Sequence, residues 1–187
     1  MVFASDTAAS LRSAVELVNS AEPPVTLTTV AELDAFFARH AYTGRHDGTA
    51  DELRDVLALR PRLRALLLAD RDTAAGLVNE MLAEARAVPR LVRHPPEDWH
   101  VHAVPDDAPL ATRILVETAT AMIDVVREDE HSRLAVCADD GCGGVVLDLS
   151  RNRSRRYCST TCSNRNAQAA HRARQADRAQ AGEPVTA

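Results

Sequence analysis

Hydrophobic residues recur at intervals of three and four along residues 11–82, the periodicity of amphipathic helices. The first stretch comprises Leu11, Ala14, Val15 and Val18. Thr29 and Thr49 each precede a Glu by three residues, a capping-box pattern that predicts two further helix starts. A kink is expected near Pro61, and another amphipathic stretch follows Asp72. The pattern therefore predicts an N-terminal group of helices joined by short connections.

The pattern changes between residues 90 and 104, where apolar and polar positions alternate on both sides of a turn-like segment at 94–98. This alternation predicts a β-hairpin. A long helix is then expected from about Pro109 to Val126, because proline at the first helical position costs no hydrogen bond. The polar run at 127–132 follows it and marks a domain boundary.

Composition supports a folded, mainly helical chain. The 187 residues are 45% hydrophobic but only 3% aromatic, with many Ala, Leu and Val, which favours helices over a large sheet. All 22 basic residues are Arg, so lysine chemistry such as a Schiff base is excluded. No apolar run approaches the ~20 residues of a membrane span, and the first residues lack a basic start. We therefore expect a cytoplasmic protein without membrane contact.

Four cysteines form two closely spaced pairs, Cys137 with Cys142 and Cys158 with Cys162. Structural disulfides are rare in the reducing cytoplasm, whereas two such pairs supply the four soft ligands of a tetrahedral zinc site. Four protein ligands leave no open position on the ion. The spacing thus predicts one structural Zn²⁺ per chain; the alternative is four reduced or redox-active thiols.

The residues around these pairs predict a small treble-clef-like zinc finger. Residues 145–149 are typical of a strand, 150–154 of a turn and 155–157 of a returning strand. Ser159 is placed to cap a helix that continues to about Gln180. The fold class is thus α+β, with a mainly helical N-terminal domain that contains a small antiparallel β element, followed by the finger. The predicted domains are residues 1–132, a finger of residues 133–180 and a flexible tail of residues 181–187.

The sign of the net charge changes at the predicted boundary between residues 132 and 133. Residues 1–132 contain 13 Arg and 22 Asp or Glu, a net charge of −9, whereas residues 133–178 contain 9 Arg and 4 Asp, a net charge of +5. A basic finger on an acidic body predicts an anionic partner, double-stranded DNA above all. The candidate DNA contacts are Arg151, Arg153, Arg155, Arg156, Arg165, Arg172 and Arg174.

These arginines fall into two predicted classes. The turn at 151–156 would project as a hairpin tip and neutralise phosphates, while Arg165 and Arg172 share a helix face that could reach base edges. His171, Arg174 and Arg178 form a second stripe on that helix. Three alternatives stay open: a basic helix that only contacts solvent, a basic helix docked on the acidic body, and arginines that balance the negative charge of zinc with four thiolates.

The finger resembles a known family. Residues 147–159 (LDLSRNRSRRYCS), 162–165 (CSNR) and 171–174 (HRAR) are similar to the CGNR zinc finger, with Ser163 where the family name has Gly. Residues 16–20 (ELVNS) and the hairpin that carries Trp99 resemble the ABATE domain that precedes this finger. The resemblance implies a stress-induced transcription regulator. Its finger would bind DNA, and its N-terminal domain would sense a small-molecule effector or form a homodimer.

Other functions remain as alternatives. An RNA-binding finger usually exposes stacking aromatic side chains, and this one offers only Tyr157. A protein-interaction finger is a further alternative. A metal-dependent enzyme is less favoured, because His100 and His102 lack a third ligand at clear spacing, and we expect no catalytic residues. Asn164 is interpreted as a local hydrogen-bonding residue near the zinc. The candidate ligand-pocket residues are Asn19, Trp99 and His102.

Overall fold

A computed structural model describes residues 3–94 and 97–180 of the chain. The helical body consists of α1 (Ser5–Asn19), α2 (Val30–Arg39), α3 (Ala50–Ala58), α4 (Arg60–Leu67), α5 (Arg71–Glu84) and α6 (Leu110–Arg127). An antiparallel hairpin of β1 (Arg90–His94) and β2 (Glu97–His102) connects α5 to α6. The finger follows, with η1 (His131–Arg133), β3 (Leu134–Val136), β4 (Val145–Leu147) and α7 (Thr160–Gln180). The predicted α+β class is confirmed.

The two threonines predicted to start helices do so. The Thr29 hydroxyl accepts a hydrogen bond from the Glu32 amide at 3.3 Å, and the Glu32 carboxylate accepts one from the Thr29 amide at 3.0 Å, which completes a capping box. Thr49 caps α3 in the same way at 3.2 Å. There the Glu52 carboxylate binds the amides of two earlier residues instead, so the second box is only half formed.

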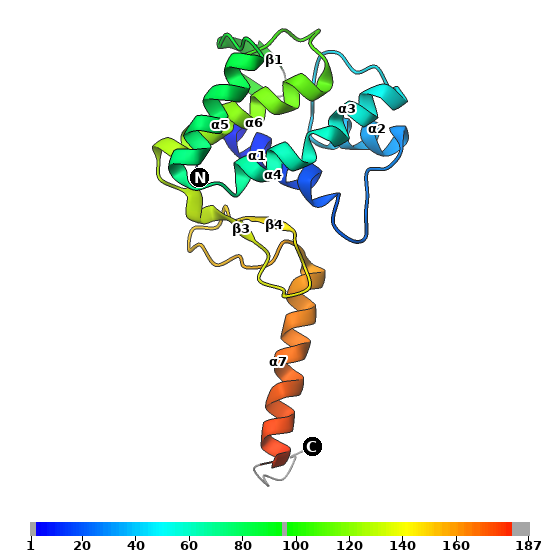
Figure 1. Ribbon diagram of the computed structural model, residues 1–187, viewed down its shortest axis with the longest axis vertical. Coiled ribbons are helices and arrows are strands. Elements are labelled where there is room, and N and C mark those ends of the chain that lie inside the picture. Colours follow the sequence, from blue (N-terminus) through cyan, green and yellow to red (C-terminus); the bar gives the residue numbers. More distant parts are fainter. Residues whose placement is uncertain (1–2, 95–96, 181–187) are drawn as a thin grey trace.

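Helix α6 lies at the centre of the body and packs against α1 and α5 (Figure 1). Its apolar side chains recur at helical spacing, and Leu110, Ile114 and Met122 are fully buried. Phe36 of α2 and Leu17 of α1 complete the same core. One large hydrophobic core thus holds the helices together, and a smaller cluster that includes Val104 and Val116 lies between α6 and the segment after β2.

That core continues across the predicted boundary at residue 132. Strands β3 and β4 pair antiparallel, with Leu134 opposite Leu147 and Val136 opposite Val145. Leu134, Val145 and Leu147 are buried among the side chains of the helical body. The hairpin of the finger therefore packs directly against the helical body and shares its hydrophobic core.

The predicted strand at residues 155–157 is wrong. β4 pairs with β3, and the loop that closes their hairpin carries Cys137 and Cys142. Residues 155–157 do not pair with a strand, because their backbone groups form other hydrogen bonds. The Arg155 amide donates to the Asp148 carboxylate, and the Arg156 carbonyl accepts from the Ala138 amide. Because no strand returns at 155–157, residues 151–156 form an exposed loop and not the predicted tip of a hairpin.

Helix α7 extends away from the rest of the molecule as a single helix (Figure 1). Cys162 is buried and Asn166 half-buried in its first turns, whereas residues 167–177 are exposed. The side chain of Arg178, the turn at 95–96 and the tail at 181–187 lie outside the described residues. Among the helices described, none is both long and apolar enough to cross a membrane.

Candidate functional site

The four cysteine sulfurs converge on one point between the finger hairpin and α7. All four Sγ atoms lie within 4.8 Å of one another. The Cys142 and Cys158 sulfurs are 3.5 Å apart, and the Cys158 and Cys162 sulfurs 3.8 Å. A Zn–S distance of about 2.3 Å in a regular tetrahedron requires sulfurs roughly 3.8 Å apart. The cluster thus has the size and donor set of a tetrahedral zinc–thiolate site.

Each ligand pair is held by its local backbone. Cys137 directly follows β3, and its amide donates to the Gly144 carbonyl at 2.8 Å, which closes the loop that carries the first pair. The second pair spans the start of α7. Ser159 caps this helix, because its hydroxyl accepts from the Cys162 amide at 3.2 Å. The first helical turn then directs Cys162 back towards Cys158.

Backbone amides donate hydrogen bonds to two of the four sulfurs. The Gly144 amide donates to Cys142 Sγ, and the Cys158 amide donates to Cys137 Sγ, each at 3.4 Å. Burial raises the pKa of Cys137, but such hydrogen bonds outweigh it and lower that pKa overall. Burial raises the pKa of Cys158 instead. A metal ion is the group that would favour its thiolate.

Gly144 lies where no larger residue fits. A Cβ atom at this position would be 2.9 Å from Cys158 Sγ and 3.3 Å from Cys142 Sγ. The first distance is below normal contact, so a side chain here would displace a ligand sulfur. Sequence reasoning missed Gly144 because its need for close backbone approach depends on a sulfur 14 residues away.

A buried carboxylate ties α7 to the first ligand pair. Asp139 accepts a hydrogen bond from Arg165 Nη1 at 2.8 Å and from Asn166 Nδ2 at 2.9 Å. Asn166 Nδ2 also donates to the Cys162 carbonyl at 3.0 Å. Asn164, by contrast, is exposed and contacts no polar group among the described residues. The local role assigned to Asn164 therefore belongs to Asn166, one helical turn after Cys162.

A second buried carboxylate shapes the loop after β4. Asp148 accepts from the Ser150 amide at 2.8 Å and from the Arg155 amide at 2.7 Å. Burial raises the pKa of Asp148, but these hydrogen bonds prevail and hold it below its usual value. The buried Arg133 donates to the carbonyls of Asp148 and Ser150 at 3.0 and 2.9 Å. The arginine-rich loop is thus held to the segment after β4 and to Arg133 of η1.

Three of the seven candidate DNA-contacting arginines have partners within the protein. Arg165 binds Asp139, and Arg153 binds Glu130 at 2.8 Å and Ser132 at 3.0 Å. Arg155 donates to two backbone carbonyls of the finger. The remaining four are exposed, and their guanidinium groups have no hydrogen bond or ion pair within residues 3–94 and 97–180: Arg151, Arg156, Arg172 and Arg174.

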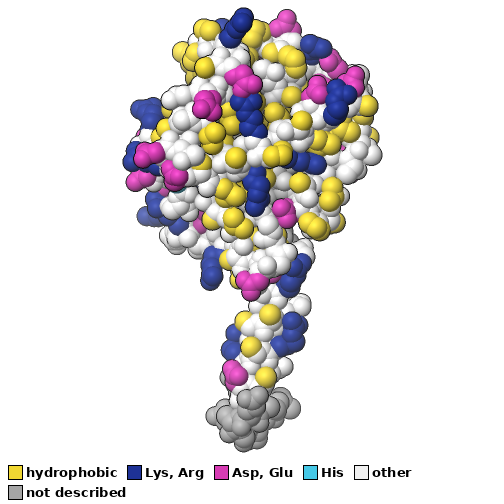
Figure 2. Space-filling model, viewed as in Figure 1, with side chains coloured by type: hydrophobic (Ala, Val, Ile, Leu, Met, Phe, Trp, Pro, Cys, Tyr) yellow, Lys and Arg dark blue, Asp and Glu magenta, His cyan; other side chains and the backbone are white. Residues whose placement is uncertain are grey.

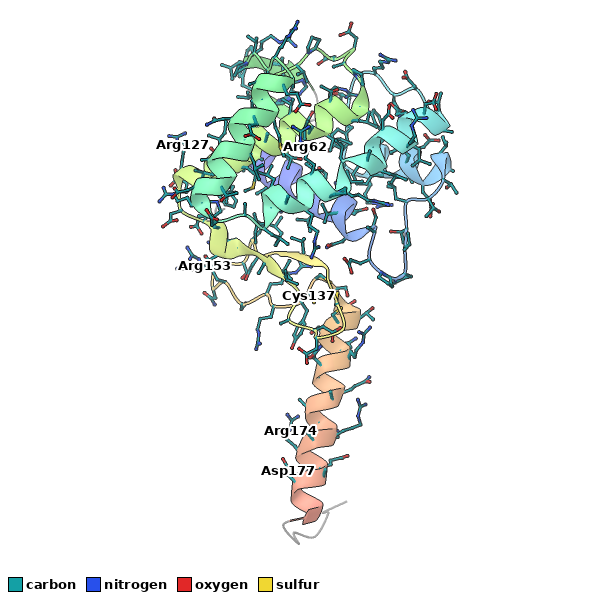
Figure 3. The ribbon with its side chains drawn as sticks, viewed as in Figure 1. Arg62, Arg127, Cys137, Arg153, Arg174 and Asp177 are labelled. Atoms are coloured by element: carbon teal, nitrogen blue, oxygen red, sulfur yellow. The ribbon has the colours of Figure 1, made fainter. Side chains whose placement is uncertain are left out.

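Figures 2 and 3 show how these side chains are presented. Arg side chains lie along both sides of the projecting α7, whereas acidic and basic side chains are mixed over the body (Figure 2). Arg174 lies on α7 away from the body, and Arg153 lies where the finger meets the body (Figure 3). The structure thus brings the candidates into two groups, one on the loop and one along the helix.

Comparison with known families agrees with this geometry. A family model described as "CGNR zinc finger" matches residues 133–175. A second, ABATE, described as "Putative stress-induced transcription regulator", matches residues 11–129, more than half of the chain. The chain belongs to the ABATE family. No curated protein matches it.

The two matches bear out the predicted order of an ABATE region followed by a CGNR finger. Together with the four converging sulfurs, the finger match identifies the metal as one structural zinc ion held by Cys137, Cys142, Cys158 and Cys162. Neither family is enzymatic. Among the described residues, the four cysteines form a group of candidate metal ligands that lie close enough to share one ion. His100 and His102 do not belong to a group of three or more such ligands among those residues.

The structure does not bring the three candidate pocket residues of the ABATE region together into one cleft. Trp99 is 62% exposed on β2. His102, also on β2, is mostly buried beside His100 and Asp106. Asn19 ends α1 at the finger: its Nδ2 donates to the Val145 carbonyl at 2.8 Å, and its Oδ1 accepts from the Val145 amide at 2.6 Å. The Asn19 side chain thus bonds the body to β4 as a neighbouring strand would.

Proposed function

We propose that this protein is a transcription regulator whose zinc finger binds double-stranded DNA. One observation carries the proposal: the zinc-held finger and its projecting helix expose Arg151, Arg156, Arg172 and Arg174 without any acidic partner among the described residues. A guanidinium that is not neutralised within the protein is free to bind phosphate. The membership in a family of transcription regulators supports the same conclusion.

The shape of the finger supports the choice of duplex DNA. A single exposed α-helix has the diameter that the major groove admits, and Arg can donate two hydrogen bonds to guanine there. Of the two helix residues predicted to reach base edges, Arg172 is the one available for this role, because Arg165 is held by Asp139. Arg151 and Arg156 in the loop would neutralise phosphates on the adjacent backbone.

The helical body would regulate this binding instead of adding to it. Its net charge of −9 opposes contact with phosphate, and its apolar helix faces are used in the core. Detection of a small-molecule effector and homodimer formation are the roles we propose for it. We place the protein in the cytoplasm, where the four thiols stay reduced and available to zinc.

The aromatic content of the finger favours DNA over single-stranded RNA. Tyr157 packs beside the cysteine cluster and is only partly accessible, so it offers no open stacking surface. RNA binding is therefore an outcome to be tested and not a second proposal.

Binding of labelled duplex should be measured by fluorescence anisotropy over a series of salt concentrations, with the zinc-loaded full chain. Arg156→Gln should weaken binding to all sequences and reduce the salt slope by about one unit, because one phosphate contact is lost. Arg127→Gln is the matched control: Arg127 is exposed at the end of α6 and binds no described residue. A variant that combines Arg156→Gln with Arg172→Gln is the decisive test. If it retains zinc and binds DNA with the same affinity as the wild type, the proposal is refuted. Preferential binding of single-stranded RNA would also refute it.

A further inference from the structure

A cleft of about 680 Å³ lies between the helical body and the finger. Its walls come from both parts: Val15 and Asn19 on α1, and Leu147 and Leu149 on β4 and the segment after it. The apolar side chains form a surface suited to the hydrophobic part of a small ligand. Of the three pocket candidates from the sequence, Asn19 alone lines this cleft.

The carboxylates of this cleft already have other hydrogen-bonding partners. Glu16 forms an ion pair with Arg39, and its Oε2 lies 2.9 Å from His40 Nε2, within hydrogen-bonding distance. Asp148 is buried and accepts hydrogen bonds from two backbone amides. Neither carboxylate forms an ion pair with Arg12 or Arg155, so the positive charge of these two side chains is not bound by an acidic side chain of the described residues.

That positive charge comes from one arginine on each side. Arg12 lies on α1, is exposed and has no hydrogen bond or ion pair within the part of the chain that the structure describes. Arg155 lies on the finger loop, and its Nε and Nη2 donate to the carbonyls of Tyr157 and Cys158 at 3.2 and 3.0 Å. Carbonyls orient the guanidinium without cancelling its charge. Two cationic groups beside an apolar wall favour a ligand that combines an anion with an apolar body.

We propose that this cleft binds a small amphipathic carboxylate. The apolar part of the ligand would lie against Val15 and Leu147, and its carboxylate would bind Arg12 and Arg155. The ligand would thus contact the body and the finger at once. Arg155 is also a candidate phosphate contact, so a bound carboxylate and DNA would compete for the same side chain. This competition rests on the proposed function in DNA binding.

Fluorine NMR can test the site with the zinc-loaded full chain. The probe is 4-(trifluoromethyl)benzoate, and the matched neutral probe is 4-(trifluoromethyl)benzamide. For a ligand of this size we expect a Kd of about 1 mM for the benzoate and at least about tenfold weaker binding of the amide. Saturable binding of both probes with equal affinity, or no saturable binding of the benzoate, would overturn the proposal.

Two variants decide whether the cleft is the place of binding. Arg12→Gln should weaken the benzoate about tenfold, because one charge-assisted contact is lost, and should leave the DNA affinity unchanged. Arg12 is exposed, so the variant should keep its circular dichroism spectrum and its zinc. Arg127→Gln, which lies outside the cleft, should bind the probe as wild type does. Unchanged benzoate binding by Arg12→Gln would contradict the assignment.

The consequence for DNA binding needs its own measurement. The benzoate titration should be repeated with saturating duplex, and the Kd of the probe should rise at least about twofold, since coupling between two ligands is reciprocal. An unchanged Kd with duplex bound would overturn the shared use of Arg155. If the chain binds no DNA at all, the proposed function fails, while the comparison of benzoate with amide still decides whether the cleft binds carboxylates.

Discussion

Replacing Asn19 with alanine should loosen the joint between the helical body and the finger. The Asn19 side chain makes two hydrogen bonds to the backbone of Val145, at 2.8 and 2.6 Å. Val145 is fully buried, so its amide and carbonyl cannot turn to bulk water when these partners are removed. The substitution therefore affects the one polar contact that fixes β4 to the end of α1.

The size of the effect follows from these two bonds. A hydrogen bond contributes about 1 kcal/mol net, and a buried group left without its partner costs about 1–3 kcal/mol. Because water can partly fill the space left by the small amide, we expect a loss of about 3 kcal/mol in the free energy of unfolding. For a chain of this length that corresponds to a Tm lower by about 9 °C.

Thermal and urea unfolding of the zinc-loaded chain, followed by far-ultraviolet circular dichroism, measure this loss. Asn79→Ala is the matched control, because Asn79 is exposed on α5 and its loss should change stability by less than about 0.5 kcal/mol. Asn19→Asp should lie between wild type and Asn19→Ala, since the carboxylate still accepts from the Val145 amide but cannot donate to its carbonyl. A loss below about 1 kcal/mol in Asn19→Ala, or equal effects of Asn19→Ala and Asn79→Ala, would refute the reasoning.

Three further predictions concern the finger and one cap. Gly144→Ala should lower zinc affinity about 10–100-fold in a chelator competition, because its Cβ would be 2.9 Å from a ligand sulfur; wild-type affinity would contradict this. Arg165→Gln should lower the free energy of unfolding by about 1 kcal/mol, since the buried Asp139 loses a charged partner, and an unchanged urea midpoint would disprove it. Hydrogen bonds from Thr28 lower the pKa of Glu32 below 4.5, so an NMR titration should find its midpoint there, whereas a midpoint at or above 4.5 would exclude the capping contact. Stability from this contact is fully present above pH 4.5 and is lost as the pH falls through the lowered pKa.

The features that sequence reasoning predicted well depend on short-range patterns. Thr29 and Thr49 start helices because a cap involves residues three positions apart. The metal centre was predictable for a similar reason, since each of its cysteine pairs lies within one short turn. Helical periodicity likewise identified α6 and its buried face.

The features that it missed depend on contacts between distant segments. Sequence reasoning noted Asn19 only as a pocket candidate, and its partner in the structure, Val145, lies 126 positions away. The strand predicted at 155–157 failed because β4 finds its partner across the cysteine loop, while Asp148 holds the Arg155 amide. Asn166 and Asp139 meet only when α7 begins beside the zinc site, so nothing in their local sequence distinguishes them.

The central proposal, that the finger of this protein binds specific DNA through unpaired arginines, is tested most directly by genomic footprinting. Purified zinc-loaded protein is mixed with fragments of its own chromosome, and the protected sites are sequenced. We predict discrete sites for the wild type and for Arg127→Gln, and their loss when Arg156→Gln and Arg172→Gln are combined. No enrichment by the wild type, or the same discrete sites with the combined variant, would contradict the account.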